Sequence, residues 1–200
     1  MNKKQGFKIL KTRSVFKKGP VHLLDCDVKL AHGTHLSRQI LKHPGAAVVL
    51  PRLDKDRYLL VRQFRFAAES WMWEFPAGGL EKRESARNAA RRELREETGM
   101  RPRKLTRILD FYPTPGLSSE VMYLFLAENL VHDHLPPDQD EELQVKAFSL
   151  REIGRLITSG RITDGKTILG YLCLKYGFRV IKKGTGYFKQ TVQKSSLSRF

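Results

Sequence analysis

The chain has 200 residues and a mass of 23.1 kDa, which suits one domain with a small appendage. Hydrophobic residues make up 40% of it and charged residues 29%, and no apolar run approaches the roughly 18 residues that a membrane helix needs, so the composition excludes a disordered chain and a membrane protein. No apolar stretch follows the basic first residues as in a secretory signal, and Cys26 and Cys173 are too few for a disulfide framework, so we expect a cytoplasmic protein.

The formal charge of +16 is concentrated at the two ends of the chain. Residues 1–18 and 175–200 each hold seven basic residues and no acidic one, and the 23 basic and 21 acidic residues between them nearly cancel. Such ends attract anionic polymers through phosphate contacts, but basic ends more often serve solubility. We therefore expect the nearly neutral body to carry the function, and nucleic-acid contact by the tails is the less favoured interpretation.

The first elements in chain order are strands. Hydrophobic and polar side chains alternate over residues 24–30, which is typical of a strand with one buried face. A second strand is expected over residues 35–41, after a turn at residues 31–34, and another over residues 7–16. Together these segments predict a small antiparallel sheet that precedes the main core.

The following region combines strands with three helices. Its expected strands cover residues 46–50, 58–63, 105–111, 121–127 and 145–148. One helix is expected over residues 85–98, a second begins at the capping box of Ser149 and Glu152, and a third runs from Asp164 to just before Gly177. The irregular alternation predicts an α+β sandwich of helices on a mixed sheet. The predicted organisation is a β-sheet region over residues 1–43, a main domain over residues 44–177 and a basic tail over residues 178–200.

Three carboxylates gather at the end of the first expected helix. Glu93, Glu96 and Glu97 lie within about one helical turn, where they repel one another and where the helix dipole already favours cations. A cation is therefore expected beside them. Arg92 and Arg95 could supply it as part of an ordinary solvated salt-bridge face.

The glycines that flank this helix favour a metal ion instead. Gly78 and Gly79 form an expected loop that permits a backbone path close to a ligand or metal, and Gly99 suits the left-handed position that ends a helix. Clustered oxygen ligands without His or Cys select hard cations such as Mg²⁺ or Mn²⁺.

Residues 78–100 resemble the Nudix box, G-x5-E-x7-R-E-U-x-E-E-x-G-U, in which U is an aliphatic residue. Every fixed position is filled, by Gly78, Glu84, Arg92, Glu93, Leu94, Glu96, Glu97, Gly99 and Met100. Nudix proteins are hydrolases of a nucleoside diphosphate linked to another group. The resemblance implies a Nudix-type α/β/α sandwich, with residues 44–177 as the catalytic domain.

The resemblance also implies a role for each residue of the site. Mg²⁺, or Mn²⁺ in its place, is implied on the side chains of Glu93, Glu96 and Glu97 and on the main-chain carbonyl of Ala77. Arg92 is implied to orient Glu84, and both are expected to be catalytic.

The water-activating carboxylate is implied on the acidic run at residues 138–142, which by itself reads as a solvated loop. We assign it to Glu141, with Glu142 and Glu96 as rivals. A carboxylate bound to a metal is a poor proton acceptor, which favours the loop over the box.

Segments outside the box resemble one branch of the superfamily, the ADP-ribose pyrophosphatases and nucleoside diphosphate sugar hydrolases. These segments are residues 63–65, 74–78, 114–120, 138–142 and 160–167. The branch implies a substrate site at Arg38, Arg65, Glu74, Gly78 and Glu120. Arg65 leaves a core strand and suits a phosphate or purine contact, whereas Trp71 and Trp73 are interpreted as packing residues rather than base stackers.

The branch further implies a homodimer, because its N-terminal sheet is exchanged or packed across a two-fold axis. Arg38 is then expected to reach the partner's base site.

These observations predict a Mg²⁺-dependent hydrolase that cleaves the diphosphate of ADP-ribose, or of a related sugar such as GDP-mannose, to a nucleoside monophosphate and a sugar phosphate. No motif chooses between these sugars. The basic tails suggest an RNA 5′-end pyrophosphohydrolase as one alternative. A non-catalytic Nudix-like nucleotide-binding module is another, and the intact glutamates argue against it.

Overall fold

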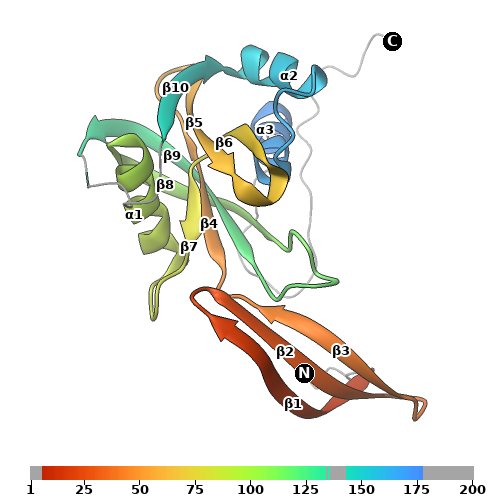
Figure 1. Ribbon diagram of the computed structural model, residues 1–200. Helices are drawn as coiled ribbons and strands as arrows, with labels where there is room; N and C mark the ends of the chain where they lie inside the picture. Colours follow the sequence, from red (N-terminus) through yellow and green to blue (C-terminus); the bar gives the residue numbers. More distant parts are fainter. Residues whose placement is uncertain (1–5, 134, 136–142, 178–200) are drawn as a thin grey trace. The chain divides into compact units, whose positions relative to one another are not determined.

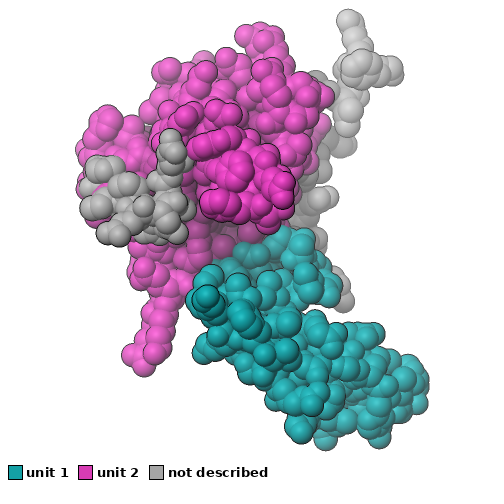
Figure 2. All heavy atoms as spheres, viewed as in Figure 1, with its two compact units in different colours: residues 1–45, 112–121 teal, residues 46–111, 122–200 magenta. Residues whose placement is uncertain are grey.

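The computed structural model describes residues 6–133, 135 and 143–177. The chain divides into two compact units, which are residues 1–45 with 112–121 and residues 46–111 with 122–200 (Figure 2). No helix in the described ranges is long and apolar enough to cross a membrane. The domain boundaries expected from the sequence, after residues 43 and 177, stay a prediction.

The first unit is a three-stranded antiparallel sheet (Figure 1). Its strands follow in the order β1 (Phe7–Lys18), β2 (Val21–Leu30) and β3 (His35–Lys42). The segment 112–121 joins β3 through Leu41, whose N–H donates to the carbonyl of Leu117 at 2.9 Å and whose carbonyl accepts from the N–H of Ser119 at 3.0 Å. The predicted small N-terminal sheet is confirmed.

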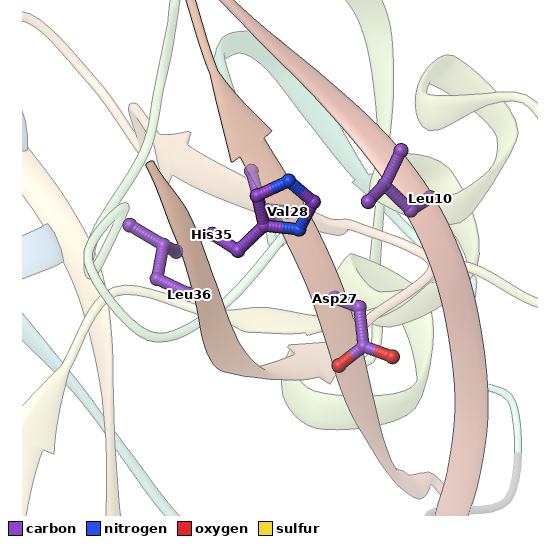
Figure 3. Close-up of a pocket in the computed structure, with 5 residues that line it drawn as sticks. All are labelled: Leu10, Asp27, Val28, His35 and Leu36. Atoms are coloured by element: carbon purple, nitrogen blue, oxygen red, sulfur yellow. The ribbon is translucent and has the colours of Figure 1, made fainter. Parts of the chain in front are cut away.

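This sheet has little buried core of its own. Cys26 and Val28 of β2 are buried, as the alternating pattern predicts, but all twelve residues of β1 are exposed. A shallow hollow on the sheet is lined by Leu10, Asp27, Val28, His35 and Leu36 (Figure 3). The unit therefore leaves much of its apolar surface in contact with solvent.

The second unit contains the remaining elements (Figure 1). They are β4 (Ala46–Pro51), β5 (Arg57–Arg65), the 3₁₀ turn η1 (Phe66–Ala68), β6 (Ser70–Glu74), β7 (Ala77–Gly79), α1 (Ala86–Thr98), β8 (Met100–Phe111), β9 (Met122–His132), β10 (Gln144–Ser149), α2 (Leu150–Thr158) and α3 (Gly165–Tyr176). One sheet has the order β7-β4-β9-β8 and the other β10-β5-β6. The pairing of β4 with β9 is parallel and the other pairs are antiparallel, so the first of these sheets is mixed.

The core forms on both faces of β4. Val49 and its alternate neighbour Ala47 pack with Ala90 and Leu94 of α1. Val48 and Leu50 point the other way and pack with β5, α2 and α3. Helices thus lie on both sides of the strands, and the predicted Nudix-type α+β sandwich is confirmed.

The helix ends follow the expected capping residues. The Ser85 side chain accepts from the N–H of Asn88 at the start of α1, and Gly99 ends that helix with a φ of 68°. Ser149 and Glu152 form the complete capping box of α2. Short polar side chains and glycine at these positions satisfy the terminal backbone groups locally, so the sequence places the ends well.

Two short strands were not expected. Ala77–Gly79, interpreted above as part of a loop, forms β7 and pairs with β4. Trp71 and Trp73 lie on β6, which pairs with β5. A three-residue strand shows no periodicity in sequence, and it exists here because β4 offers hydrogen bonds to it. Trp73 packs edge-on against Phe148 in the core, as a packing residue should, whereas Trp71 is 39% exposed.

Candidate active site

Arg92 of α1 joins the carboxylates of the box. Its guanidinium donates to Glu84 from Nε at 3.1 Å and from Nη2 at 3.0 Å. Nη1 lies 2.7 Å from Glu93 Oε1 and 2.9 Å from Glu96 Oε2. Nη2 also donates to the carbonyl of Gly79 at 2.9 Å, so one side chain ties α1 to β7 and to the loop before the helix.

These contacts keep both Glu84 and Arg92 ionised. Burial raises the pKa of Glu84, but the hydrogen bonds from Arg92 outweigh it and hold that pKa below the usual range. Burial likewise lowers the pKa of Arg92, and the facing carboxylates raise it by more. The predicted relation between Arg92 and Glu84 is thus a direct two-nitrogen contact, which suits an orienting role.

The strand β7 lies against the Glu93 carboxylate. A methyl group added at Gly78 would overlap the carboxyl atoms of Glu93, so glycine at this position lets that carboxylate lie against the backbone. Glu93 is 8% exposed and Glu97 4% exposed, and both lie on α1 facing inward. The main chain at Ala77 and the buried helix carboxylates therefore belong to one small region.

This region has the chemistry of a site for a hard cation. Its donors are carboxylate and carbonyl oxygens, which Mg²⁺ and Mn²⁺ prefer. Within the described residues no three His, Cys, Asp or Glu side chains are grouped tightly enough to enclose a metal ion. Two of the expected metal ligands, Glu93 and Glu96, form ion pairs with Arg92 instead. The close approach of Gly78 to Glu93 places the main chain of β7 beside one of these carboxylates.

A second charged pair joins Arg65, the last residue of β5, to Glu74, the last residue of the antiparallel strand β6. Arg65 donates to both oxygens of Glu74, from Nε at 2.8 Å and from Nη2 at 2.6 Å. Glu74 is 1% exposed. The pKa of Arg65 is raised, chiefly by these bonds and further by the nearby charge of Glu97, which relates the pair to the box. Two of the predicted substrate residues are thus in direct contact with each other.

Two other predicted substrate residues lie in the first unit. Arg38 is exposed on β3 and donates to the carbonyl of Ser37 at 3.0 Å. Glu120 lies with its carboxylate 3.5 Å from His43 Nδ1. Their roles stay predictions, and so do those of Glu141 and Glu142, which lie outside the described residues.

The sequence reasoning missed Lys166, which contacts Glu74, and assigned Asp164 only a capping role. One feature of the sequence did indicate a carboxylate partner for Lys166. A lysine in the first turn of a helix faces the positive end of the helix dipole, so it needs a carboxylate partner to be well placed there.

Comparison with known proteins identifies the class to which this fold and site belong. The NUDIX domain family matches residues 41–169, and the chain belongs to that family. The ADP-ribose pyrophosphatase of Bacillus subtilis (strain 168) is 37% identical over 179 residues, which cover 88% of this chain and 97% of the relative. The GDP-mannose pyrophosphatase of Yersinia pestis (strain Pestoides F) is 29% identical over 161 residues, covering 74% and 81%.

A solved structure shows the same fold. The crystal structure of an ADP compounds hydrolase superposes with a TM-score of 0.76 at 22% identity, over 88% of this chain and 95% of that one. The family match and the Bacillus subtilis relative confirm the predicted membership of the ADP-ribose pyrophosphatase branch and the prediction of a Nudix pyrophosphatase.

Proposed function

We propose that this protein hydrolyses the diphosphate of ADP-ribose, or of a related nucleoside diphosphate sugar such as GDP-mannose, to a nucleoside monophosphate and a sugar phosphate. The observation that carries the proposal is the cluster centred on Arg92, which gathers Glu84, Glu93 and Glu96 beside a glycine backbone. The substrates named for the two relatives support the class of substrate.

The proposed cofactor is Mg²⁺, with Mn²⁺ as a substitute. The residues that would hold it are Ala77, through its carbonyl, and Glu93, Glu96 and Glu97. When bound, such an ion neutralises the charge of a diphosphate and makes its phosphorus easier to attack by water.

The chain's own residues bind and orient the substrate. The pairing of Arg65 with Glu74 uses Nε and Nη2 and leaves Nη1 outside the pair, where it can donate to a phosphate oxygen. Gly78 is proposed to lie beside the diphosphate, where its bare backbone leaves room for the Glu93 carboxylate. Arg38 and Glu120 of the first unit are proposed as further substrate residues, and Arg38 is proposed to reach the base site of the partner subunit.

The attacking water must lose a proton. We propose that Glu141 accepts this proton, because a carboxylate outside the box is a better proton acceptor than the box carboxylates, whose charged form a bound cation stabilises. Glu142 and Glu96 are the rivals for this role.

We also propose a homodimer formed through the first unit. The exposed apolar side chains of β1 and of the first residue of β2 are those of Phe7 (47% exposed), Ile9 (49%), Leu10 (46%), Val15 (59%), Phe16 (51%) and Val21 (43%). Grouped apolar side chains of this size are typical of a surface that another protein covers. Sedimentation equilibrium tests the dimer, and fractionation of the source cells tests the cytoplasmic location.

Hydrolysis assays on a panel of substrates test the function. ADP-ribose, GDP-mannose and a triphosphate-ended RNA are each incubated with protein and Mg²⁺ or EDTA, and the products are separated by chromatography. Glu97→Gln serves as the inactivated control, because it removes one charge of a repulsive cluster and should retain the fold. Turnover of the RNA alone would favour the RNA 5′-end enzyme, and binding without turnover of any substrate would favour the nucleotide-binding module.

A further inference from the structure

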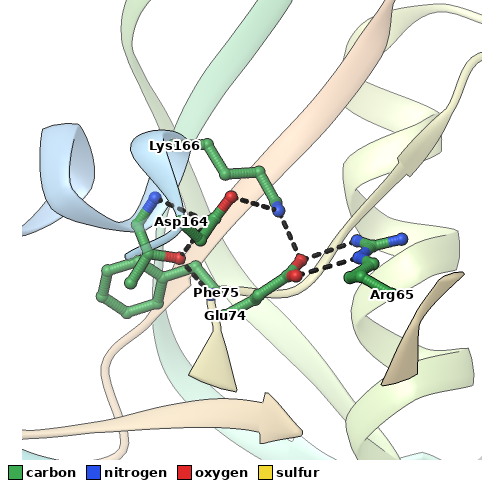
Figure 4. A network of polar contacts seen from close by, with 6 residues as sticks. Arg65, Glu74, Phe75, Asp164 and Lys166 are labelled. Carbon is green, nitrogen blue, oxygen red and sulfur yellow. Dashed lines mark hydrogen bonds and ion pairs between the residues drawn. The ribbon is translucent and has the colours of Figure 1, made fainter. Parts of the chain in front are cut away.

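A network of charges, buried at Glu74 and Lys166 and partly exposed at Arg65, joins β5 and β6 to the start of α3 (Figure 4). Lys166 Nζ contacts Glu74 Oε2 and lies 3.0 Å from Asp164 Oδ1. Arg65 approaches the same Glu74 carboxylate from another direction and donates two hydrogen bonds to it. The side chain of Lys166 is 9% exposed and that of Glu74 is 1% exposed, so solvent screens these charges weakly.

Glu74 depends on both of its cations. Burial raises the pKa of Glu74, but the hydrogen bonds from Arg65 and the charge of Lys166 outweigh burial and bring that pKa below its ordinary value. Oε2 receives both Lys166 and Nη2 of Arg65. Without Lys166, the Glu74 carboxylate would be held by Arg65 alone. The Glu74 side chain, together with the guanidinium bound to it, would then be free to change its orientation.

Lys166 itself stands on a rigid support. Its partner Asp164 caps α3, because Oδ2 accepts from the Thr167 N–H at 2.9 Å and from the Thr167 hydroxyl at 2.6 Å. The same hydroxyl accepts from the N–H of Phe75 at 2.8 Å. The start of α3 is thereby fixed to Phe75, the residue that follows Glu74. The backbone positions of Lys166 and Glu74 are therefore fixed relative to each other.

We infer that Lys166 is a positioning residue for Arg65: it holds Glu74 in the place from which Glu74 fixes the guanidinium. The inference rests on the proposed contact between Arg65 and the substrate phosphate. A planar guanidinium held by two hydrogen bonds has one orientation. Its remaining nitrogen, Nη1, is therefore already directed toward the phosphate before the substrate binds, and little conformational entropy is lost on binding. Lys166 acts through Glu74, since its ammonium group is engaged by two carboxylates and its side chain is buried.

The first test measures the order of Arg65 without any substrate. In protein labelled with ¹⁵N-arginine, the Arg65 Nε–H signal is assigned by its loss in Arg65→Lys, and its hydrogen exchange is compared between variants. Lys166→Met should speed the exchange at least tenfold, whereas Lys166→Arg should stay within threefold of the wild type. Lys175→Met, the same change at an exposed position of α3, is the matched control. If circular dichroism shows that Lys166→Met is unfolded, Lys166→Gln is used in its place.

The second test is a double-mutant cycle in ADP-ribose hydrolysis. Lys166→Met should raise KM about tenfold and change kcat less than threefold, and in an Arg65→Ala background it should change KM less than twofold. Unchanged exchange of the Arg65 signal overturns the inference. A KM effect that persists in the Arg65→Ala background overturns it as well, since Lys166 would then contact the substrate itself. A wild-type protein that hydrolyses no nucleoside diphosphate sugar refutes the proposed function, and the exchange measurement still decides the role of Lys166.

Discussion

In the variant Arg92→Gln, three largely buried carboxylates and the exposed Glu81 lose the guanidinium that joins them. Removing one partner of a buried ion pair costs about 3–5 kcal/mol, because it leaves an uncompensated charge. Here the carboxylates of Glu84, Glu93 and Glu96 are 11–18% exposed and Arg92 is 21% exposed, so water recovers part of that cost. We expect a loss of about 2–4 kcal/mol in the free energy of unfolding. For a chain of this size that corresponds to a fall in Tm of about 5–12 °C.

The assay is thermal unfolding followed by circular dichroism in EDTA, so that no divalent ion replaces the lost charge. Arg91→Gln is the matched control, because Arg91 is exposed on the same helix and its loss should change stability by no more than about 0.5 kcal/mol. Arg92→Lys keeps the charge but not the planar fork, and should recover only part of the stability. A Tm of Arg92→Gln within about 2 °C of the Arg91→Gln value would refute the reasoning that this residue holds the cluster together.

Three further predictions concern other parts of the site. Gly78→Ala should cost about 1–3 kcal/mol in unfolding free energy and abolish most activity, because its methyl group overlaps Glu93, whereas Gly79→Ala, whose methyl group meets no atom within 4 Å, should unfold like the wild type in urea. Glu141→Gln should lower kcat roughly 10²- to 10⁴-fold with little change in KM, and an unchanged kcat in stopped assays would remove Glu141 from the mechanism. Because the folded-state pKa of Glu74 is lowered, its stabilisation is complete above the unfolded value of about 4.3 and is lost as the pH falls below it. Urea unfolding across pH 3–7 should show this acid-side loss, and an equally steep loss in Glu74→Gln would contradict it.

The parts of the fold with local causes could be predicted from the sequence. α1 and α2 begin at Ser85 and Ser149, whose side chains satisfy backbone donors within their own turn. The strand β7 could not be predicted, because its hydrogen bonds come from β4, some thirty residues earlier in the chain. Short strands of this kind are specified by a partner rather than by their own residues.

The candidate site also has one part that could be predicted from the sequence and one part that could not. The spacing of Arg92, Glu93 and Glu96 along one helix is enough to place them on neighbouring positions of α1, so this part of the site follows from the sequence. The contact of Lys166 with Glu74 joins residues 92 positions apart, and the fold brings them together by attaching the start of α3 to Phe75, the residue after Glu74. Long-range polar contacts of this kind leave a weak sequence signal, such as a lysine in an unfavourable first turn.

The strand β1 has a consequence for how copies of this protein can meet. It lies at the edge of its sheet, where unpaired backbone groups would accept a strand from another molecule and start a growing aggregate. Five of its twelve residues are basic and none is acidic, namely Lys8, Lys11, Arg13, Lys17 and Lys18. Two such strands brought edge to edge would repel along their whole length, whereas the apolar side chains on the face of the sheet carry no such penalty. We therefore expect the basic residues of β1 to disfavour this edge pairing, and we expect their neutralisation to favour fibrous association over the proposed dimer.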